Sequence, residues 1–194
     1  MRKMFRSPKA NGHAIVYGER IGLFHIGMTV KELKRLLGEP DYIRDATRYG
    51  TGFAYTWRGL SKEFRLSGHP VLRAYAVSSM EDAMVYSISV FGIRESAELK
   101  RGYPRAIALH REIERYRTSD GFGIGSTMAS VAEKYGEAHW NIIKSAAIVS
   151  YKTGDRSTGF GFPNPDPSAD NVVNSVNVTN RAALRQLAHQ MPMP

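Results

Sequence analysis

The chain has 194 residues, of which 42% are apolar and 23% are charged, a composition typical of a folded globular protein. It contains no cysteine, which excludes disulfides, thiol catalysis and thiolate metal sites. No apolar run approaches the length of about 18 residues that suggests a membrane-spanning helix, so we expect no membrane span.

Positive charge is concentrated in the first part of the chain. Residues 1–117 hold 21 Lys and Arg residues against 12 Asp and Glu residues, whereas residues 118–194 hold 6 of each. Such an excess indicates either a solvated basic surface or attraction to an acidic protein, a nucleic acid or an anionic membrane. Because net charge acts first on solubility, the solvated surface is the favoured interpretation.

The first 13 residues are basic and polar, and we expect a flexible end there. Residues 1–6 have the charge of the beginning of a signal peptide, but residues 7–13 are polar where an apolar stretch would follow. As it stands, the chain is expected in the cytoplasm. Removal of a leader would instead place it in the bacterial periplasm or envelope.

Two segments of the chain, residues 24–40 and 122–138, align without a gap at an offset of 98 residues. Phe, Ile, Gly, Thr, Gly and Glu stand at equivalent positions in both segments. In each copy a short helix is predicted, starting at Val30 and at Met128, because apolar residues recur there at helical spacing.

Capping residues bound both predicted helices. Thr29 and Thr127 precede them, and Gly38 and Gly136 follow where a residue often adopts the left-handed conformation. Glu32 completes a capping box in the first copy, and the second copy lacks this glutamate. Both helices are therefore predicted with defined ends.

Strands are predicted after each helix because apolar or aromatic residues alternate there with small or polar ones. The expected strands of the first unit cover residues 48–57, 62–66, 71–77 and 84–90, and those of the second cover residues 147–153, 157–162 and 172–178.

The predicted organisation has five parts. They are a basic flexible N-terminus (1–13), a first helix-plus-sheet unit (14–93), a charged connector (94–118) with a helix from Pro104, a second unit (119–180), and a C-terminal helix and tail (181–194). The predicted fold class is α+β. It consists of two tandem units, each a short helical motif packed on an antiparallel β-sheet, which share one curved sheet.

The motif of Ile-Gly-Met-Thr, short helix and Leu-Gly-Glu-Pro resembles a known group. It is similar to the tandem-repeat domain of the beta-lactamase inhibitor protein and of outer-membrane assembly lipoproteins of the SmpA/OmlA type. The likeness is carried by Ile26, Gly27, Met28, Thr29, Leu36, Leu37, Gly38 and Pro40, and in the second unit by Ile124, Gly125, Thr127, Gly136 and Glu137.

The resemblance implies a bacterial, non-enzymatic binder, commonly in the cell envelope, that grips a partner protein with a curved sheet. The inhibitor's disulfides and the lipoprotein's lipid-bearing cysteine are both missing, because the chain has no cysteine. Inhibition of a beta-lactamase is not implied, since a shared fold does not carry a function with it.

An alternating aromatic stripe is the main candidate for a binding surface. It places four side chains on one face of a predicted strand: Tyr49, Phe53, Tyr55 and Trp57. Facing solvent, it would be an aromatic platform for a partner, whereas facing the helices it would be core. The opposite face is small and polar, which slightly favours the core. The predicted partner-binding site adds four flanking basic residues: Arg58, Lys62, Arg65 and Arg73.

No catalytic, cofactor or metal site is predicted. Residues 121–127 contain three glycines, but no lysine follows them and the first copy has only one of these glycines, so they are interpreted as helix-entry geometry. No two histidines have the i, i+4 spacing of a helical zinc motif, and no Gly-x-Ser-x-Gly elbow is present. We therefore expect a protein that is not an enzyme.

The predicted function is a non-enzymatic protein–protein binding module, namely an inhibitor, an immunity-type protein or an envelope assembly factor. Its partner is expected to be another protein, with acidic character. The alternative is a basic nucleic-acid-binding protein that uses the first unit, since aromatic and basic residues on a sheet can stack single-stranded bases. No nucleic-acid-binding motif supports this alternative. The oligomeric state and the partner's identity stay open.

Overall fold

A computed structural model describes residues 14–47, 51–57, 72–92, 104–136, 140–143, 146–164, 171–182 and 185. The described helices are α1 (Val30–Leu37), α3 (Pro104–Ile113) and α4 (Met128–Tyr135). A small three-stranded sheet contains β1 (Ile15–Val16), β2 (Arg20–Ile21) and β3 (Phe24–His25).

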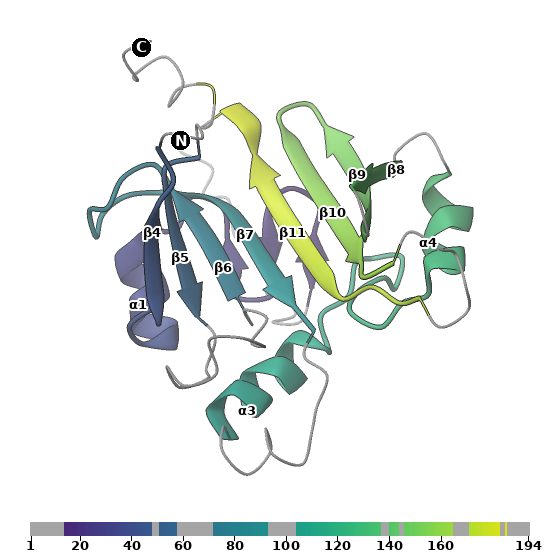
Figure 1. Cartoon of the computed structure of the whole chain (residues 1–194), viewed down its shortest axis with the longest axis horizontal. Helices are drawn as coiled ribbons and strands as arrows, with labels where there is room; N and C mark the ends of the chain where they lie inside the picture. Colours follow the sequence, from purple (N-terminus) through teal and green to yellow (C-terminus); the bar gives the residue numbers. More distant parts are fainter. Residues whose placement is uncertain are drawn as a thin grey trace, which may run out of the picture.

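Eight strands form the main sheet of the molecule (Figure 1). They are β4 (Tyr42–Asp45), β5 (Phe53–Trp57), β6 (Leu72–Ala76), β7 (Val85–Phe91), β8 (Trp140–Ile143), β9 (Ala146–Thr153), β10 (Arg156–Phe162) and β11 (Ser175–Asn180). The structure thus confirms the α+β class with antiparallel sheets.

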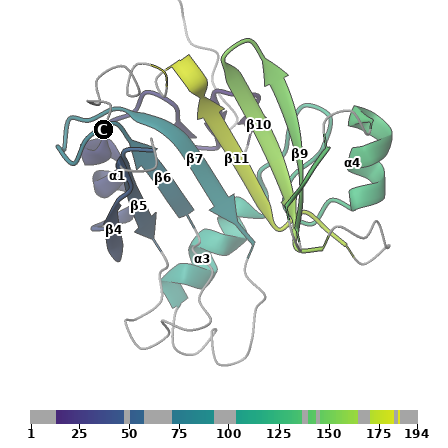
Figure 2. The ribbon, with the colours of Figure 1, turned by 45° about the horizontal axis from the view of Figure 1, so that its top comes forward.

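The strand order shows how the two parts of the chain combine. The order is β4-β5-β6-β7-β11-β10-β9-β8, and every neighbouring pair is antiparallel. Two four-stranded meanders therefore meet where β7 pairs with β11, which places the last strand of each meander at the centre of the sheet. Figure 2 shows the same order from a second direction, with α4 beside β9.

The predicted helix caps are present in both copies. The Thr29 hydroxyl accepts a hydrogen bond from the Glu32 backbone N–H at 3.2 Å, and the Glu32 carboxylate accepts one from the Thr29 backbone N–H at 2.7 Å. In the second copy the Thr127 hydroxyl accepts from the Ser130 backbone N–H at 3.2 Å. The reciprocal carboxylate bond exists only in the first copy, as the sequence predicts.

The repeat extends from sequence into backbone geometry. The glycine before each helix donates to a residue at the start of a central strand or just before one, Gly27 to the Val85 carbonyl at 2.8 Å and Gly125 to the Val173 carbonyl at 2.9 Å. Their φ angles are 90° and 87°, in the region that favours glycine. The turn into each helix is therefore tied to the sheet in the same way twice.

The core lies between one face of the eight-stranded sheet and the elements that cover it. Figure 1 shows α1 and the purple β1–β3 strands behind the sheet. The covering elements bury Ile21, Phe24, Val30, Leu33, Met128 and Val131, which pack with the sheet residues Tyr55, Leu72, Ile88, Phe160 and Val176.

Helix α3 confirms the helix predicted from Pro104. Its apolar side is buried at Ile107 and Ile113, and the following Tyr116 is 1% exposed. The Ile15 backbone N–H donates to the Arg117 carbonyl at 2.7 Å, which joins the end of this segment to the N-terminal sheet. The predicted connector therefore contributes to the core.

Several elements were not predicted from the sequence, namely β1–β3, β4 and β8. Strand β4 reads Tyr-Ile-Arg-Asp and is exposed along its whole length, so it lacks the apolar alternation that marks a half-buried strand. At the C-terminus, Asn180 Oδ1 accepts from the Ala182 backbone N–H at 3.0 Å, as expected for a cap. Residues 1–13, the predicted strand over 62–66 and most of the predicted C-terminal helix lie outside the described residues.

Candidate binding surface on the open face of the sheet

The face of the eight-stranded sheet opposite the core is called the open face here. In Figure 1 it points toward the viewer, and none of the labelled helices crosses it. Cross-strand pairing places Tyr42, Thr56, Arg73, Ser89 and Asn177 in one row across five strands. This row and its neighbours define the candidate surface.

The predicted aromatic stripe needs a correction, because Tyr55 and Trp57 belong to the core. They are 1% and 4% exposed, with ring centroids 6.4 Å apart in a stacked arrangement. Trp57 Nε1 donates to the Gly38 carbonyl at 3.0 Å, so its polar atom is satisfied inside the protein. The helix that covers this face, α1, is the physical reason for the burial. An exposed platform of Tyr55 and Trp57 does not exist.

The other predicted site residues have different positions. Phe53 is partly buried and packs against the core. Arg73 is half-buried on the open face, as a member of the row of Tyr42 and Thr56. The remaining predicted site residues lie outside the described part of the chain, namely Tyr49, Arg58, Lys62 and Arg65.

Arg73 occupies a distinctive place on the open face. Its guanidinium carbon lies 5.8 Å from the centroid of the Phe91 ring, a cation–π arrangement between β6 and β7. Within the described residues, no carboxylate forms an ion pair with Arg73. The open face therefore carries a half-buried positive charge that the described residues do not neutralise.

A hollow of about 290 Å³ lies beside Arg73. The polar residues that line it are Tyr42, Arg44, Thr51, Thr56, Arg73 and Tyr75. No carboxylate of the described residues lines it. The arrangement supplies hydrogen-bond donors and positive charge, which suits a small anionic group.

Polar side chains lie over glycines in the half of the open face formed by the second meander. Asn177 and Ser175 on β11 lie over Gly159 and Gly161 on β10, where an added Cβ would overlap Asn177 Oδ1 and Ser175 Oγ. Glycine at these two positions therefore leaves room for the polar side chains to lie across the strand. This half of the open face therefore carries hydroxyl and amide groups beside the apolar Ile148 of β9.

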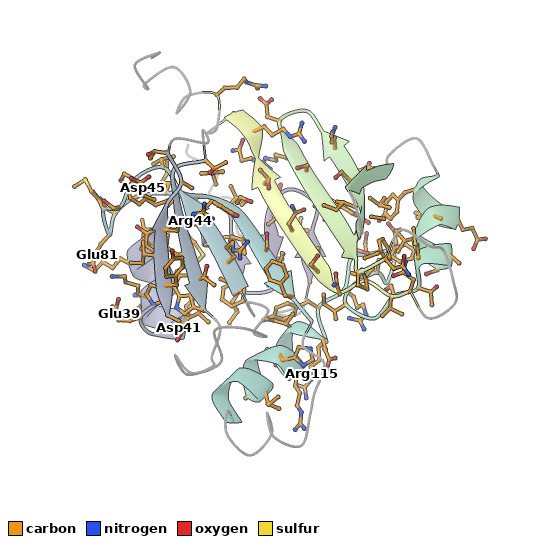
Figure 3. All side chains as sticks on the ribbon, in the orientation of Figure 1. Glu39, Asp41, Arg44, Asp45, Glu81 and Arg115 are labelled. Atoms are coloured by element: carbon orange, nitrogen blue, oxygen red, sulfur yellow. The ribbon has the colours of Figure 1, made fainter. Side chains whose placement is uncertain are left out.

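Strand β4 forms one edge of the sheet and is protected by charge. Figure 3 shows Asp41 and Asp45 toward its two ends, with Arg44 beside Asp45 and with Glu39 and Glu81 nearby. Charged residues on an edge strand oppose pairing with another chain. We therefore place the candidate surface on the open face and not on this edge.

A pair of tyrosines between the N-terminal sheet and α4 is a second candidate for a functional site. The Tyr17 hydroxyl hydrogen-bonds to the Tyr135 hydroxyl and donates to Asp120 Oδ2 at 3.1 Å. Burial raises the pKa of both tyrosines above the ordinary value of 10.0. Ionised tyrosine is therefore disfavoured there, and the pair joins the β1–β2 turn to α4 as a packing contact.

Metal and membrane sites receive no support in the described part of the chain. No group of three or more His, Cys, Asp or Glu side chains is placed there to hold a metal ion. None of its helices combines the length and apolar character needed to cross a membrane.

Sequence reasoning identified Arg73 but missed most of its neighbours on the open face. Residues 72–76 read Leu-Arg-Ala-Tyr-Ala, so the alternation that buries Leu72, Ala74 and Ala76 also directs Arg73 and Tyr75 to the other face. This signal was available in the sequence. Alternation could not identify Tyr42 and Arg44, because β4 itself was not predicted.

Comparisons of the chain with known protein families, with curated proteins and with solved structures found no match. The open face is therefore defined by its own geometry and chemistry.

Proposed function

We propose that this chain is a non-enzymatic protein-binding module that contacts its partner with the open face of the eight-stranded sheet. The observation that carries the proposal is the asymmetry of the sheet. One face is buried under α1, α4 and β1–β3, whereas none of the described elements covers the other face, which presents Tyr42, Arg73 and Tyr75.

The residue types on the open face support a protein interface. Tyrosine and arginine are the side chains that, with tryptophan, carry most of the binding energy at protein–protein contacts. Tyr42 is 52% exposed, so much of its ring is available to a partner. The hydroxyl and amide groups of β7 and β11 can supply the polar contacts that surround such anchors.

The resemblance of the helix motifs to the beta-lactamase inhibitor protein and the SmpA/OmlA lipoproteins supports the same class of function. Proteins of that group are non-enzymatic binders that use a sheet surface. The role proposed for this chain is accordingly that of an inhibitor, an immunity-type protein or an envelope assembly factor.

Nucleic-acid binding is the second candidate, because Arg73 and Tyr75 combine a cation and an aromatic ring on one sheet face. The acidic residues at the β4 edge argue against it, since a phosphate backbone that crossed this edge would meet Asp41 and Asp45. The experiment below separates the two candidates.

The test is affinity capture from a native lysate, followed by mass spectrometry, with and without nuclease. Wild type is compared with the open-face variant Tyr42→Ala/Tyr75→Ala and with the control variant Arg35→Ala/Leu36→Ala on the exposed side of α1. We expect a nuclease-resistant protein that the control retains and the open-face variant loses. A partner that both variants retain equally would contradict the proposal, and capture of nucleic acid alone would favour the second candidate.

A further inference from the structure

We infer that the hollow beside Arg73 receives a carboxylate from the partner, so that the segment recognised on the open face presents an Asp or Glu side chain as its anchor. The inference rests on the proposed function, because it takes the open face as the contact surface. It goes further by naming the chemical group that is bound and the residue that binds it.

The first step concerns the state of Arg73 in the protein alone. The guanidinium carbon of Arg73 lies 5.8 Å from the centroid of the Phe91 ring, a cation–π contact that restrains the side chain. None of the hydrogen bonds or ion pairs within the described residues involves its N–H groups. The charge of Arg73 is thus half-buried and uncompensated by the described residues.

The second step is the chemistry of the ligand. A guanidinium group pairs with a carboxylate through two parallel N–H···O bonds, which are stronger than bonds between neutral groups. Tyr42 and Tyr75 also line the hollow, and a tyrosine hydroxyl can donate a further hydrogen bond to a bound carboxylate. Arg44 adds a second positive charge to the lining. All of these features stabilise an anion.

The size of the hollow favours a side chain over a free small molecule. The hollow of about 290 Å³ lies at or just below the lower end of the range of roughly 300–1,000 Å³ that encloses drug-sized ligands. It is also open on one side, at the surface of the sheet. A side chain that enters while its backbone lies across the strands fits this shape better, because the remainder of the partner is bound elsewhere on the open face.

The fourth step distinguishes a carboxylate on a protein from a phosphate on a nucleic acid. A single carboxylate interacts with the hollow locally, whereas a polyanion extends over the β4 edge and its acidic residues Glu39, Asp41 and Asp45. Local positive charge within an acidic edge favours the isolated carboxylate.

The experiment uses a probe that does not require the natural partner. A phage-displayed library of random 12-residue peptides is selected against the full chain, against Arg73→Gln and against the control Arg35→Gln. Wild type and the control are expected to enrich Asp or Glu at one recurring position, and Arg73→Gln is expected to lose this preference. A selected peptide should bind Arg73→Gln roughly 10- to 100-fold more weakly, the range expected for a charged hydrogen-bonded contact.

The decisive test reverses the charge of Arg73. Arg73→Glu should select Lys or Arg at the same peptide position, which loss of folding could not produce. An acidic preference that Arg73→Gln retains would overturn the inference while leaving the open face as the binding surface, provided that Tyr42→Ala still weakens the peptides. Failure to enrich any peptide, or enrichment unaffected by every open-face variant, would overturn the inference and the proposed function together. Binding of a labelled oligothymidine in an Arg73-dependent manner would overturn both in favour of nucleic acid.

Discussion

Ser89 on β7 lies opposite Asn177 on β11, as the middle pair of the five that join the two meanders. On the core side of the same ladder, Ile88 pairs with Val178 and Val90 with Val176, and all four are at most 1% exposed. The junction thus combines a buried apolar seam with a polar row on the open face. This relationship makes the two halves of the chain parts of one sheet and one core.

The seam predicts that both halves unfold together. Ile88→Ala should lower the free energy of unfolding by about 2–4 kcal/mol, because it opens a cavity at a fully buried position of β7. Urea unfolding followed by far-UV circular dichroism and by tryptophan fluorescence should give one coincident transition in wild type and variant. Leu23→Ala, at a side chain that is 59% exposed, serves as control and should change little. Two separated transitions would show that the meanders are independent.

The sequence was sufficient for the elements whose signals are local. Thr29, Thr127 and the following glycines defined both helices, because a cap and a stop lie within a few residues of each other. The pairing of β7 with β11 could not be predicted in the same way. Its partners are 88 residues apart at Ser89 and Asn177, and alternation within a strand does not name the strand that will lie beside it.

The candidate site was only partly predictable for a related reason. The alternation of Phe53, Tyr55 and Trp57 showed that they share a face, but the side on which α1 packs decides whether that face is core. Arg73 was identified from its charge and position, whereas its relation to Phe91 required the register of β6 against β7. The local sequence therefore showed which residues share a face. Tertiary packing decided which face is buried in the core and which is open.

The two helix caps differ, and this difference predicts unequal effects of one substitution. Thr29→Ala removes a hydroxyl that belongs to a reciprocal capping box, whereas Thr127→Ala removes a cap without the returning carboxylate. We expect losses of about 1–2 kcal/mol for Thr29→Ala and about 0.5–1 kcal/mol for Thr127→Ala in the free energy of unfolding. Urea unfolding at neutral pH measures both. An equal or reversed order would show that the carboxylate adds nothing to the first cap.

The same capping box predicts a dependence on pH. Hydrogen bonds from the Thr29 backbone and side chain lower the pKa of Glu32 below its ordinary value of 4.5. A carboxylate with a lowered folded-state pKa stabilises the protein above pH 4.5, and this contribution is lost as the pH falls through the folded-state pKa. Glu32→Gln should therefore lose less stability than wild type between about pH 6 and pH 3. The measurement is the urea midpoint at both pH values, and identical changes in the two proteins would contradict the assignment.

Tyr116 predicts a loss of folding stability at alkaline pH. Burial raises its pKa to about 12 from the ordinary value of 10.0, and its ring packs so closely against Gly22 that an added Cβ there would overlap it. A tyrosine with a raised folded-state pKa contributes stability below pH 10, which is lost as the pH rises toward 12. Tyr116→Phe should therefore lose stability less steeply than wild type over this interval, by roughly 2 kcal/mol at most.

The measurement compares how steeply the free energy of unfolding falls with pH, and not its absolute value, because the variant also lacks the hydroxyl at neutral pH. Some slope should persist in the variant, since burial raises the pKa of Tyr17, Tyr86 and Tyr135 as well. If the free energy of unfolding fell with pH equally steeply in both proteins, folding would not raise the pKa of Tyr116.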